Sequence, residues 1–95
     1  MQFEWDEAKR LANLAKHGLD FEDVGSVWDR DLFDVAGTRI AGDELRILAL
    51  GVMGDDAEVI AVVYTVRASR IRLISLRRAN RYERQVFRSR FGYGR

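Results

Sequence analysis

The sequence predicts a single α+β domain with a mostly antiparallel sheet and the element order β-α-α-β-β-β-β-α. Apolar residues recur at helical spacing near both ends of the chain, and near-continuous apolar runs rich in β-branched residues fill its middle. The length supports the same prediction, because 95 residues allow one domain with one modest core, extending over residues 1–95.

The first predicted elements are a short strand and a helix. Residues 3–5 favour a strand, and Asp6 fits the N-cap of a helix over residues 7–17. Gly18 suits the position just beyond the end of that helix. Four apolar positions repeat at helical spacing, and we expect them to face the core: Ala8, Leu11, Ala12 and Ala15.

A second helix is predicted directly after the first. Asp20 is its expected N-cap, and its end is expected near Trp28 or Asp29. Its apolar face comprises Phe21, Val24, Val27 and Trp28.

The middle of the chain is predicted to be β-structure. Four runs are expected to form strands: residues 32–35, 46–53, 58–66 and 71–76. Residues 37–42 are expected to form a loop, and the Gly54-Asp55-Asp56 segment indicates a hairpin turn. The run 59–66 is apolar almost throughout, which predicts a central strand buried on both faces.

A third helix is predicted over residues 81–91, with Asn80 and Glu83 as a capping box and Gly92 at its end. The residues expected to pack inward are Tyr82, Val86 and Phe87. On the opposite face we expect Arg81, Arg84 and Arg88. Near the C-terminus, Phe87, Phe91 and Tyr93 either close the core or remain exposed for a partner.

The composition excludes several classes of function. The chain has no cysteine and one histidine, which excludes disulfides, a cysteine nucleophile and a multi-histidine zinc site. We expect no metal or other cofactor. No apolar run approaches the roughly 18 residues of a membrane span, and the N-terminus does not resemble a signal peptide, so a cytoplasmic protein is expected.

The charges are segregated along the chain. Residues 1–66 carry 14 acidic and six basic side chains, a balance of −8. Residues 67–95 carry ten arginines and one carboxylate, Glu83, a balance of +9. Because arginine binds phosphate in a bidentate manner and stacks on bases, this block indicates a polyanionic partner. The alternative is that the basic half pairs with the acidic half within the molecule.

Two groups of residues are candidates for chemistry. In the first helix, Lys9, Asn13, Lys16 and His17 share one stripe that would hold a phosphate and move a proton. The alternative is a solvated helix face, on which the helix dipole favours His17 at the C-terminal end.

The second group extends from the last strand into the third helix. It comprises Arg70, Arg72, Ser75, Arg77, Arg78, Asn80, Arg81, Tyr82, Glu83 and Arg84. Alternation predicts Ser75 on the same strand face as Ile71 and Leu73, opposite the arginines. Arginines around a helix N-terminus form an anion site. Glu83 serves either the site or only the capping box.

Two blocks of the sequence resemble the BrnT family over residues 3–88. The first contains Phe3-Glu4-Trp5-Asp6-Glu7-Ala8-Lys9, Asn13, Lys16-His17-Gly18 and Phe21-Glu22. The second contains Val63-Tyr64-Thr65, Arg70-Ile71-Arg72-Leu73-Ile74-Ser75, Arg77-Arg78-Ala79, Arg81 and Glu83-Arg84. Residues 29–44 match little.

The resemblance implies a ribonuclease toxin of a type II toxin–antitoxin system, with a fold like that of the RelE toxins. Such toxins inhibit translation by cleaving RNA, and a BrnA antitoxin with a ribbon-helix-helix domain neutralises them. Operator DNA is then bound only through the toxin–antitoxin complex. A homodimer of the toxin within that complex is compatible with the family resemblance.

Metal-free RNA cleavage needs a base, an acid and cations for the crowded phosphate. The expected catalytic residues are His17, Arg77, Arg78, Arg81, Tyr82 and Glu83. The residues expected to bind RNA phosphates are Lys9, Asn13, Lys16, Arg70, Arg72, Arg84 and Arg88. The rival hypothesis is a non-catalytic basic module that binds an acidic partner or nucleic acid, including operator DNA as a co-repressor.

Overall fold

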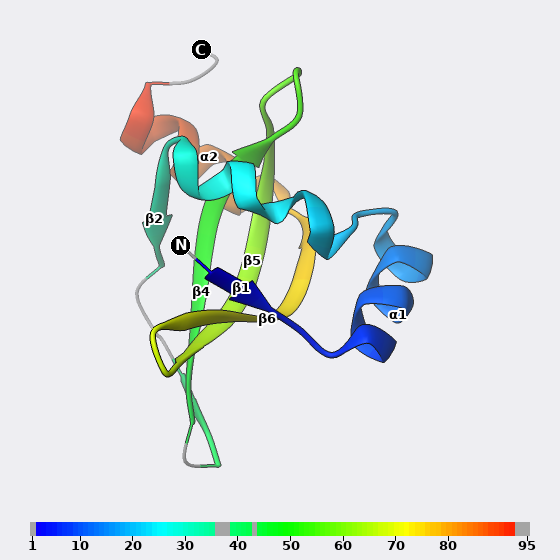
Figure 1. The fold of residues 1–95 in the computed structure, drawn as a ribbon. Helices are drawn as coiled ribbons and strands as arrows, with labels where there is room; N and C mark the ends of the chain where they lie inside the picture. Colours follow the sequence, from blue (N-terminus) through cyan, green and yellow to red (C-terminus); the bar gives the residue numbers. More distant parts are fainter. Residues whose placement is uncertain (1, 36–38, 43, 93–95) are drawn as a thin grey trace.

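The computed structural model describes residues 2–35, 39–42 and 44–92, which form a twisted sheet with helices on both faces (Figure 1). The strands are β1 (Gln2–Glu4), β2 (Leu32–Asp34), β3 (Arg39–Ala41), β4 (Glu44–Met53), β5 (Glu58–Arg67) and β6 (Arg70–Arg78). Five lie in the order β1-β6-β5-β4-β2, and β3 pairs with the first part of β4. All of these pairings except β1 with β6 are antiparallel, which confirms the α+β class and the mostly antiparallel sheet.

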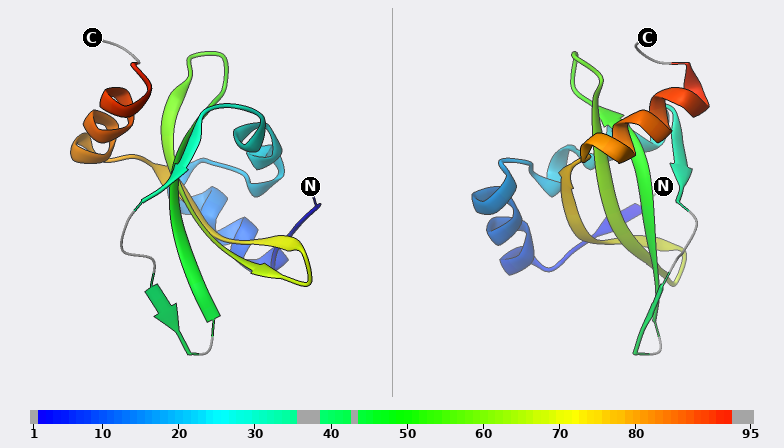
Figure 2. Two further views of the ribbon diagram at one scale, coloured as in Figure 1. Left: turned by 90° about the vertical axis from the view of Figure 1, so that its left-hand side faces the viewer. Right: turned by 180° about the vertical axis from the view of Figure 1, so that it is seen from behind.

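Three helices surround this sheet: α1 (Glu7–His17), the 3₁₀ helix η1 (Phe21–Asp29) and α2 (Arg81–Phe91). The sheet lies between η1 and α2, and α1 lies beside β6 (Figure 2). Within the described ranges, no helix is long and apolar enough to cross a membrane.

The core has two apolar layers, one on each face of β5. Ile60 and Val62 belong to the layer that contains the η1 residues, whereas Val59 and Ala61 belong to the layer that contains Phe87 of α2. All four β5 residues are at most 3% exposed. The prediction of a central strand buried on both faces is therefore confirmed.

The predicted loop over residues 37–42 is wrong in part, because residues 39–41 form β3 and pair with β4. Residues 37 and 38 lie outside the described ranges. The segment between residues 35 and 44 holds few of the apolar residues on which strand prediction depends. This extra strand also corrects the predicted element order: the sequence predicts four strands between the second and third helices, and the described residues form five between η1 and α2.

The helix ends agree with their predicted caps. Asp6 Oδ1 accepts a hydrogen bond from Ala8 N at 2.9 Å, and Asn80 and Glu83 form a complete capping box. Gly18 and Gly92 terminate α1 and α2 in the left-handed conformation, with φ of 70° and 75°. Asp20 caps the second helix as predicted, and this element is a 3₁₀ rather than an α-helix.

The predicted inward face of α2 is wrong in part, and that of α1 is wrong. On α2, Phe87 is fully buried and Phe91 packs against the same core, but Tyr82 is 73% exposed. Phe87 and Phe91 therefore close the core, and Tyr93 lies outside the described residues. On α1, the four apolar residues expected in the core are all exposed: Ala8, Leu11, Ala12 and Ala15. The inner face of this helix is polar.

A β-bulge in β6 corrects the predicted position of Ser75. Ser75 pairs with Val63 and Leu73 pairs with Tyr64, so Ile74 has no partner on β5. The extra residue shifts the alternation, and Leu76 joins Ile71 and Leu73 in the core. Ser75 is thereby moved away from the face on which strict alternation places it.

Candidate active site

Helix α1 lies against the part of β6 that β1 does not cover. β1 pairs only with residues 70–72, so it leaves residues 73–78 without a strand partner on that edge of β6. Asn13 satisfies the backbone of Leu76 at this edge. Its Oδ1 accepts a hydrogen bond from Leu76 N at 3.1 Å, and its Nδ2 donates one to Leu76 O at 2.8 Å. The amide also donates to Leu19 O at 3.2 Å. Asn13 therefore acts in place of a β-strand partner and is buried.

An open hollow of about 280 Å³ lies between α1 and β6. The residues that line it are Lys9, Ala12, Asn13, Lys16, His17, Ile74 and Ser75. Two ammonium groups, an imidazole and a hydroxyl thus converge on one hollow, although Lys16 and Ser75 are nearly 60 residues apart in the sequence. Of the predicted RNA-binding residues, Lys9 and Lys16 are exposed, and neither has an ion-pair partner among the described residues.

Arg78 connects this hollow to the second predicted group of residues. Its Nη1 donates to the backbone carbonyl of His17 at 2.6 Å, and its Nε donates to Glu58 at 2.8 Å. The carbonyl of His17 is at the C-terminus of α1, where a cation is electrostatically favoured. The end of β6 and the first helix, whose proximity the sequence alone does not establish, therefore meet at Arg78.

Arg77 and Glu83 form a bidentate ion pair at the junction of β6 and α2. The two N···O distances are 2.8 and 2.9 Å, and Glu83 also accepts from Asn80 N. Hydrogen bonding to Arg77, and next to Asn80 N, holds the pKa of Glu83 below its usual range. A carboxylate with a lowered pKa and three donors is a weak base. Neither residue lines the hollow.

The remaining predicted residues of α2 are on its surface. Arg81, Tyr82 and Arg88 are exposed, and within the described ranges neither arginine has an ion-pair partner. Arg84 donates to Ala79 O at 2.9 Å. The α2 surface is therefore cationic, with one exposed aromatic ring beside it.

Arg70 and Arg72 have internal partners. Both pair with Glu4 on the neighbouring strand β1, at 3.7 and 3.2 Å. This arrangement agrees with the alternative in which basic and acidic segments pair within the molecule. Both side chains keep partial exposure, and neither lines the hollow between α1 and β6.

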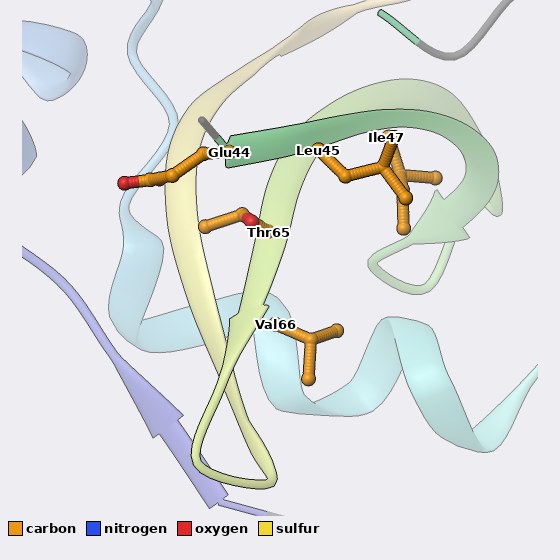
Figure 3. Close-up of a pocket in the computed structure, with 5 residues that line it drawn as sticks. All are labelled: Glu44, Leu45, Ile47, Thr65 and Val66. Carbon is orange, nitrogen blue, oxygen red and sulfur yellow. The ribbon is translucent and has the colours of Figure 1, made fainter. Parts of the chain in front are cut away.

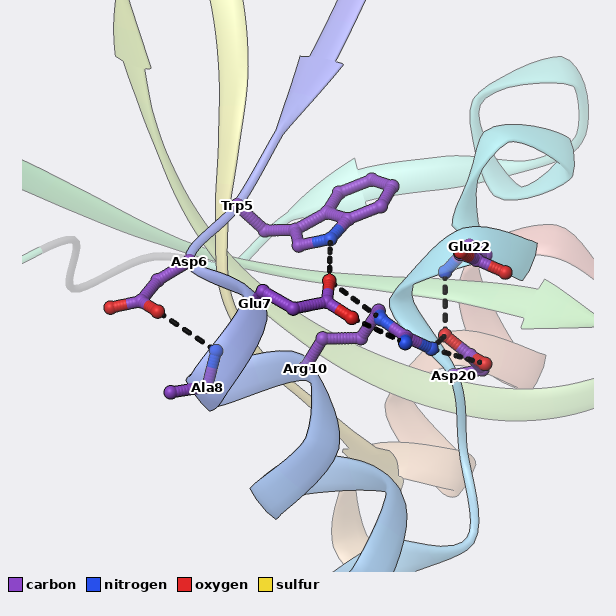
Figure 4. Close-up of polar contacts among 7 residues, drawn as sticks. All are labelled: Trp5, Asp6, Glu7, Ala8, Arg10, Asp20 and Glu22. Atoms are coloured by element: carbon purple, nitrogen blue, oxygen red, sulfur yellow. Dashed lines mark hydrogen bonds and ion pairs between the residues drawn. The ribbon is translucent and has the colours of Figure 1, made fainter.

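A polar network fixes α1 relative to η1, and sequence patterns did not indicate it (Figure 4). Arg10 pairs with Glu7 at 2.5 Å and with Asp20, the N-cap of η1, at 3.0 Å. Trp5 Nε1 donates to Glu7, and hydrogen bonding to Arg10 lowers the pKa of that carboxyl. The pKa of Asp20 is lowered first by the Glu22 N–H and then by Arg10. Arg10 thus links α1 to the start of η1.

A second hollow, of about 210 Å³, lies on β4 and β5 (Figure 3). Leu45, Ile47, Thr65 and Val66 line it, together with Glu44. Glu44 is paired with Arg67, and hydrogen bonding to this arginine lowers its pKa. This hollow is mostly apolar and presents no group suited to acid or base chemistry.

Sequence reasoning placed Lys9, Lys16 and His17 on one stripe, but it missed Ser75 as their neighbour. Predicting that Ser75 lies beside these residues would require knowledge of the bulge at Ile74, and no residue pattern in the sequence indicates that bulge. In the part of the chain that the structure describes, no three His, Cys, Asp or Glu side chains gather as a metal site would require.

Comparison with known proteins identifies the family. Residues 5–83 match the family model described as the ribonuclease toxin, BrnT, of type II toxin–antitoxin systems. No protein of curated function matches the chain. The matched segment includes α1, strands β2 to β6 and the first turn of α2, and therefore both sides of the hollow. The chain belongs to the BrnT family, whose members are ribonuclease toxins with an RNA substrate and an antitoxin partner.

Proposed function

We propose that this chain cleaves RNA without a metal ion, with the scissile phosphate bound in the hollow between α1 and β6. The observation that carries the proposal is the convergence of Lys9, Lys16 and His17 with Ser75 in this hollow. Arg78 lies at its end through the bond to the His17 carbonyl. Cationic side chains supply there the charge that a metal ion would otherwise supply to a phosphate.

The proposed reaction is an internal transfer at phosphorus. The 2′-hydroxyl gives its proton to a water molecule and its oxygen bonds to the adjacent phosphorus, while the bond from phosphorus to the 5′-oxygen breaks. The products are a 2′,3′-cyclic phosphate and a 5′-hydroxyl, and the leaving oxygen takes a proton. His17 is the proposed acid, because it lines the hollow and an imidazole is suited to proton transfer near neutral pH.

We assign roles to the other predicted site residues from the contacts that each of them makes. Asn13, Arg77 and Glu83 have their polar atoms bonded inside the protein, which supports a positioning role for each. Arg81 and Arg88, with Tyr82 as a stacking group, are exposed and suited to RNA that extends beyond the hollow. Arg70 and Arg72 on β6 and Arg84 on α2 are further cations with exposed surface that are suited to binding RNA phosphates.

The resemblance of the two sequence blocks supports the finer assignments. We propose a RelE-like fold for the chain and a BrnA-like antitoxin with a ribbon-helix-helix domain as its partner. Operator DNA is then bound through that antitoxin, with room for a toxin homodimer in the complex. The segregated charges, with arginines concentrated after residue 66, suit a toxin that binds RNA directly.

The test is incubation of the purified chain with bulk RNA in EDTA, beside His17→Ala and Arg78→Ala. We expect cleavage by the wild type and a loss of at least 100-fold for each variant, because each removes a group proposed at the phosphate. Glu58→Gln is the matched control, because it breaks the ion pair of Arg78 and keeps the guanidinium.

Three outcomes would contradict the proposal. Cleavage by the wild type that EDTA abolishes would show a metal requirement. Equal cleavage by the wild type and all variants would show that the active site lies elsewhere in the protein. Failure of the wild type and of all variants to cleave, together with salt-dependent RNA binding, would favour the non-catalytic binding module.

A further inference from the structure

Helix α1 exposes its apolar face to solvent, which is the reverse of the usual arrangement of a surface helix. Leu11 is 52% exposed and Leu14 37%, and Ala8 and Ala15 are exposed beside them. We call these four residues the α1 stripe. The residues that face the protein are polar: Arg10, Asn13 and His17 are the less exposed positions of the helix.

This orientation is fixed by specific bonds. Asn13 is bonded to Leu76 of β6, and Arg10 is paired with Asp20 of η1. The His17 carbonyl also accepts from Arg78. A rotation that buried the α1 stripe in the molecule would break all of these contacts, so the stripe is available only to another molecule.

The charges beside the α1 stripe define the partner that fits it. Lys9 and Lys16 lie along one flank, and neither has an ion pair within the described ranges. On the other flank, Glu7 is already neutralised by Arg10, which also pairs with Asp20. A partner helix with apolar residues on one face and carboxylates on one edge matches this pattern.

The α1 stripe also adjoins the hollow between α1 and β6. Lys9 and Lys16 line that hollow, and Ala12 joins the hollow to the stripe. A helix lying on the stripe with its carboxylates on the two lysines would cover the hollow. Its carboxylates would occupy the positions proposed for RNA phosphates.

We propose that the α1 stripe docks an acidic amphipathic helix of the antitoxin, which inhibits the toxin by covering the hollow. The docking surface is inferred from α1 itself, and only the inhibition rests on the proposed function. A second copy of the chain fits less well, because two antiparallel α1 helices related by a two-fold axis place their lysines on the same flank. RNA also fits less well, because aliphatic side chains offer its phosphates and bases neither charge nor an aromatic ring for stacking.

The experiment compares Leu11→Glu with Leu45→Glu in titrations against the cognate antitoxin purified from co-expression. The two leucines are 52% and 53% exposed, and Leu45 lies on β4, where it lines the second hollow. We expect antitoxin binding at least tenfold weaker for Leu11→Glu and within twofold of wild type for Leu45→Glu. Lys16→Glu should also weaken binding, whereas Lys16→Arg should retain it. Binding of Leu11→Glu within twofold of wild type would overturn the proposal.

Controls separate the alternatives. Circular dichroism and thermal melting check folding, and Ala15→Glu tests the same stripe if Leu11→Glu does not fold. A free chain that is a dimer in light scattering and becomes monomeric with Leu11→Glu would overturn the proposal in favour of a second copy. Weaker RNA binding with unchanged antitoxin binding would overturn it in favour of RNA.

Cleavage of bulk RNA is measured separately, without antitoxin. Leu11→Glu should cleave as the wild type does and escape inhibition by the antitoxin. If the wild type does not cleave RNA, the proposed function fails, yet the difference in antitoxin binding still decides whether the α1 stripe is the docking surface.

Discussion

Glu83 holds the corner between β6 and α2 through bonds to two different elements. It accepts two hydrogen bonds from Arg77 on β6 and one from Asn80 N at the start of α2. The side chain is only 12% exposed, so these bonds replace contact with water. The sequence motif predicted the cap, and it left open whether the carboxylate also has a catalytic role. The geometry supports a positioning role.

The lowered pKa of Glu83 predicts a pH-dependent contribution to stability. The folded state prefers the ionised carboxyl, so its contribution is complete above the unfolded pKa and is lost as pH falls through the folded pKa. Glu83→Gln should therefore destabilise the protein by about 1–3 kcal/mol at pH 7. Below about pH 4 the difference from wild type should shrink.

Urea denaturation between pH 3 and pH 7 measures both proteins under the same conditions. Glu22→Gln is the control, because Glu22 is exposed and has no ion pair among the described residues. A difference between wild type and Glu83→Gln that stays constant down to pH 3 would show that the ionised carboxylate is not what stabilises the corner.

At the scale of the element, the side-chain amide of Asn13 pairs α1 with the backbone edge of β6. A helix against a strand edge must satisfy N–H and C=O groups that point sideways, and apolar side chains offer no partner for them. Asn13 provides both a donor and an acceptor to Leu76. This requirement explains why the polar face of α1 points inward and its apolar face outward.

The variant Asn13→Asp should show how much this amide contributes to the stability of the protein. An ionised aspartate can accept from Leu76 N but repels Leu76 O, so we expect a loss of about 1–3 kcal/mol at pH 8. A protonated aspartate can donate again, and the loss should shrink as pH falls towards 4. Denaturation curves at several pH values measure this, with Ala15→Asp as the control on the exposed face. A pH-independent loss would contradict the proposed pairing.

The same elements show what sequence reasoning could and could not provide. The bounds of α1 and α2 followed from local capping residues, and the burial of β5 followed from its own apolar run. The inward face of α1 could not be predicted, because it depends on an edge of β6 created by the shortness of β1. The position of Ser75 depends on a bulge that is visible only from the pairing of β5 with β6.

At the scale of the whole molecule, the charge segregation in the sequence has two consequences. Arg67, Arg70, Arg72 and Arg78 from the basic half pair with Glu44, Glu4 and Glu58 from the acidic half. Within the described ranges, Arg81 and Arg88 on α2 have no carboxylate partner. The basic half therefore both stabilises the sheet and presents charge to a polyanion, and the two sequence interpretations apply to different arginines.

This division predicts which charges control RNA binding. When a cationic side chain binds a phosphate of single-stranded RNA, counterions are released. The plot of log affinity against log salt concentration therefore becomes steeper by about 0.7 for each phosphate contact. Arg81→Gln should therefore weaken RNA binding and reduce the slope by about 0.7. The measurement is fluorescence anisotropy with a 2′-O-methyl RNA, which cannot be cleaved, at several salt concentrations. Arg30→Gln removes the same charge from a residue that contacts the Gly54 carbonyl, and it should leave the slope unchanged. Equal effects of both variants would mean that RNA responds to the net charge rather than to the surface formed by α2.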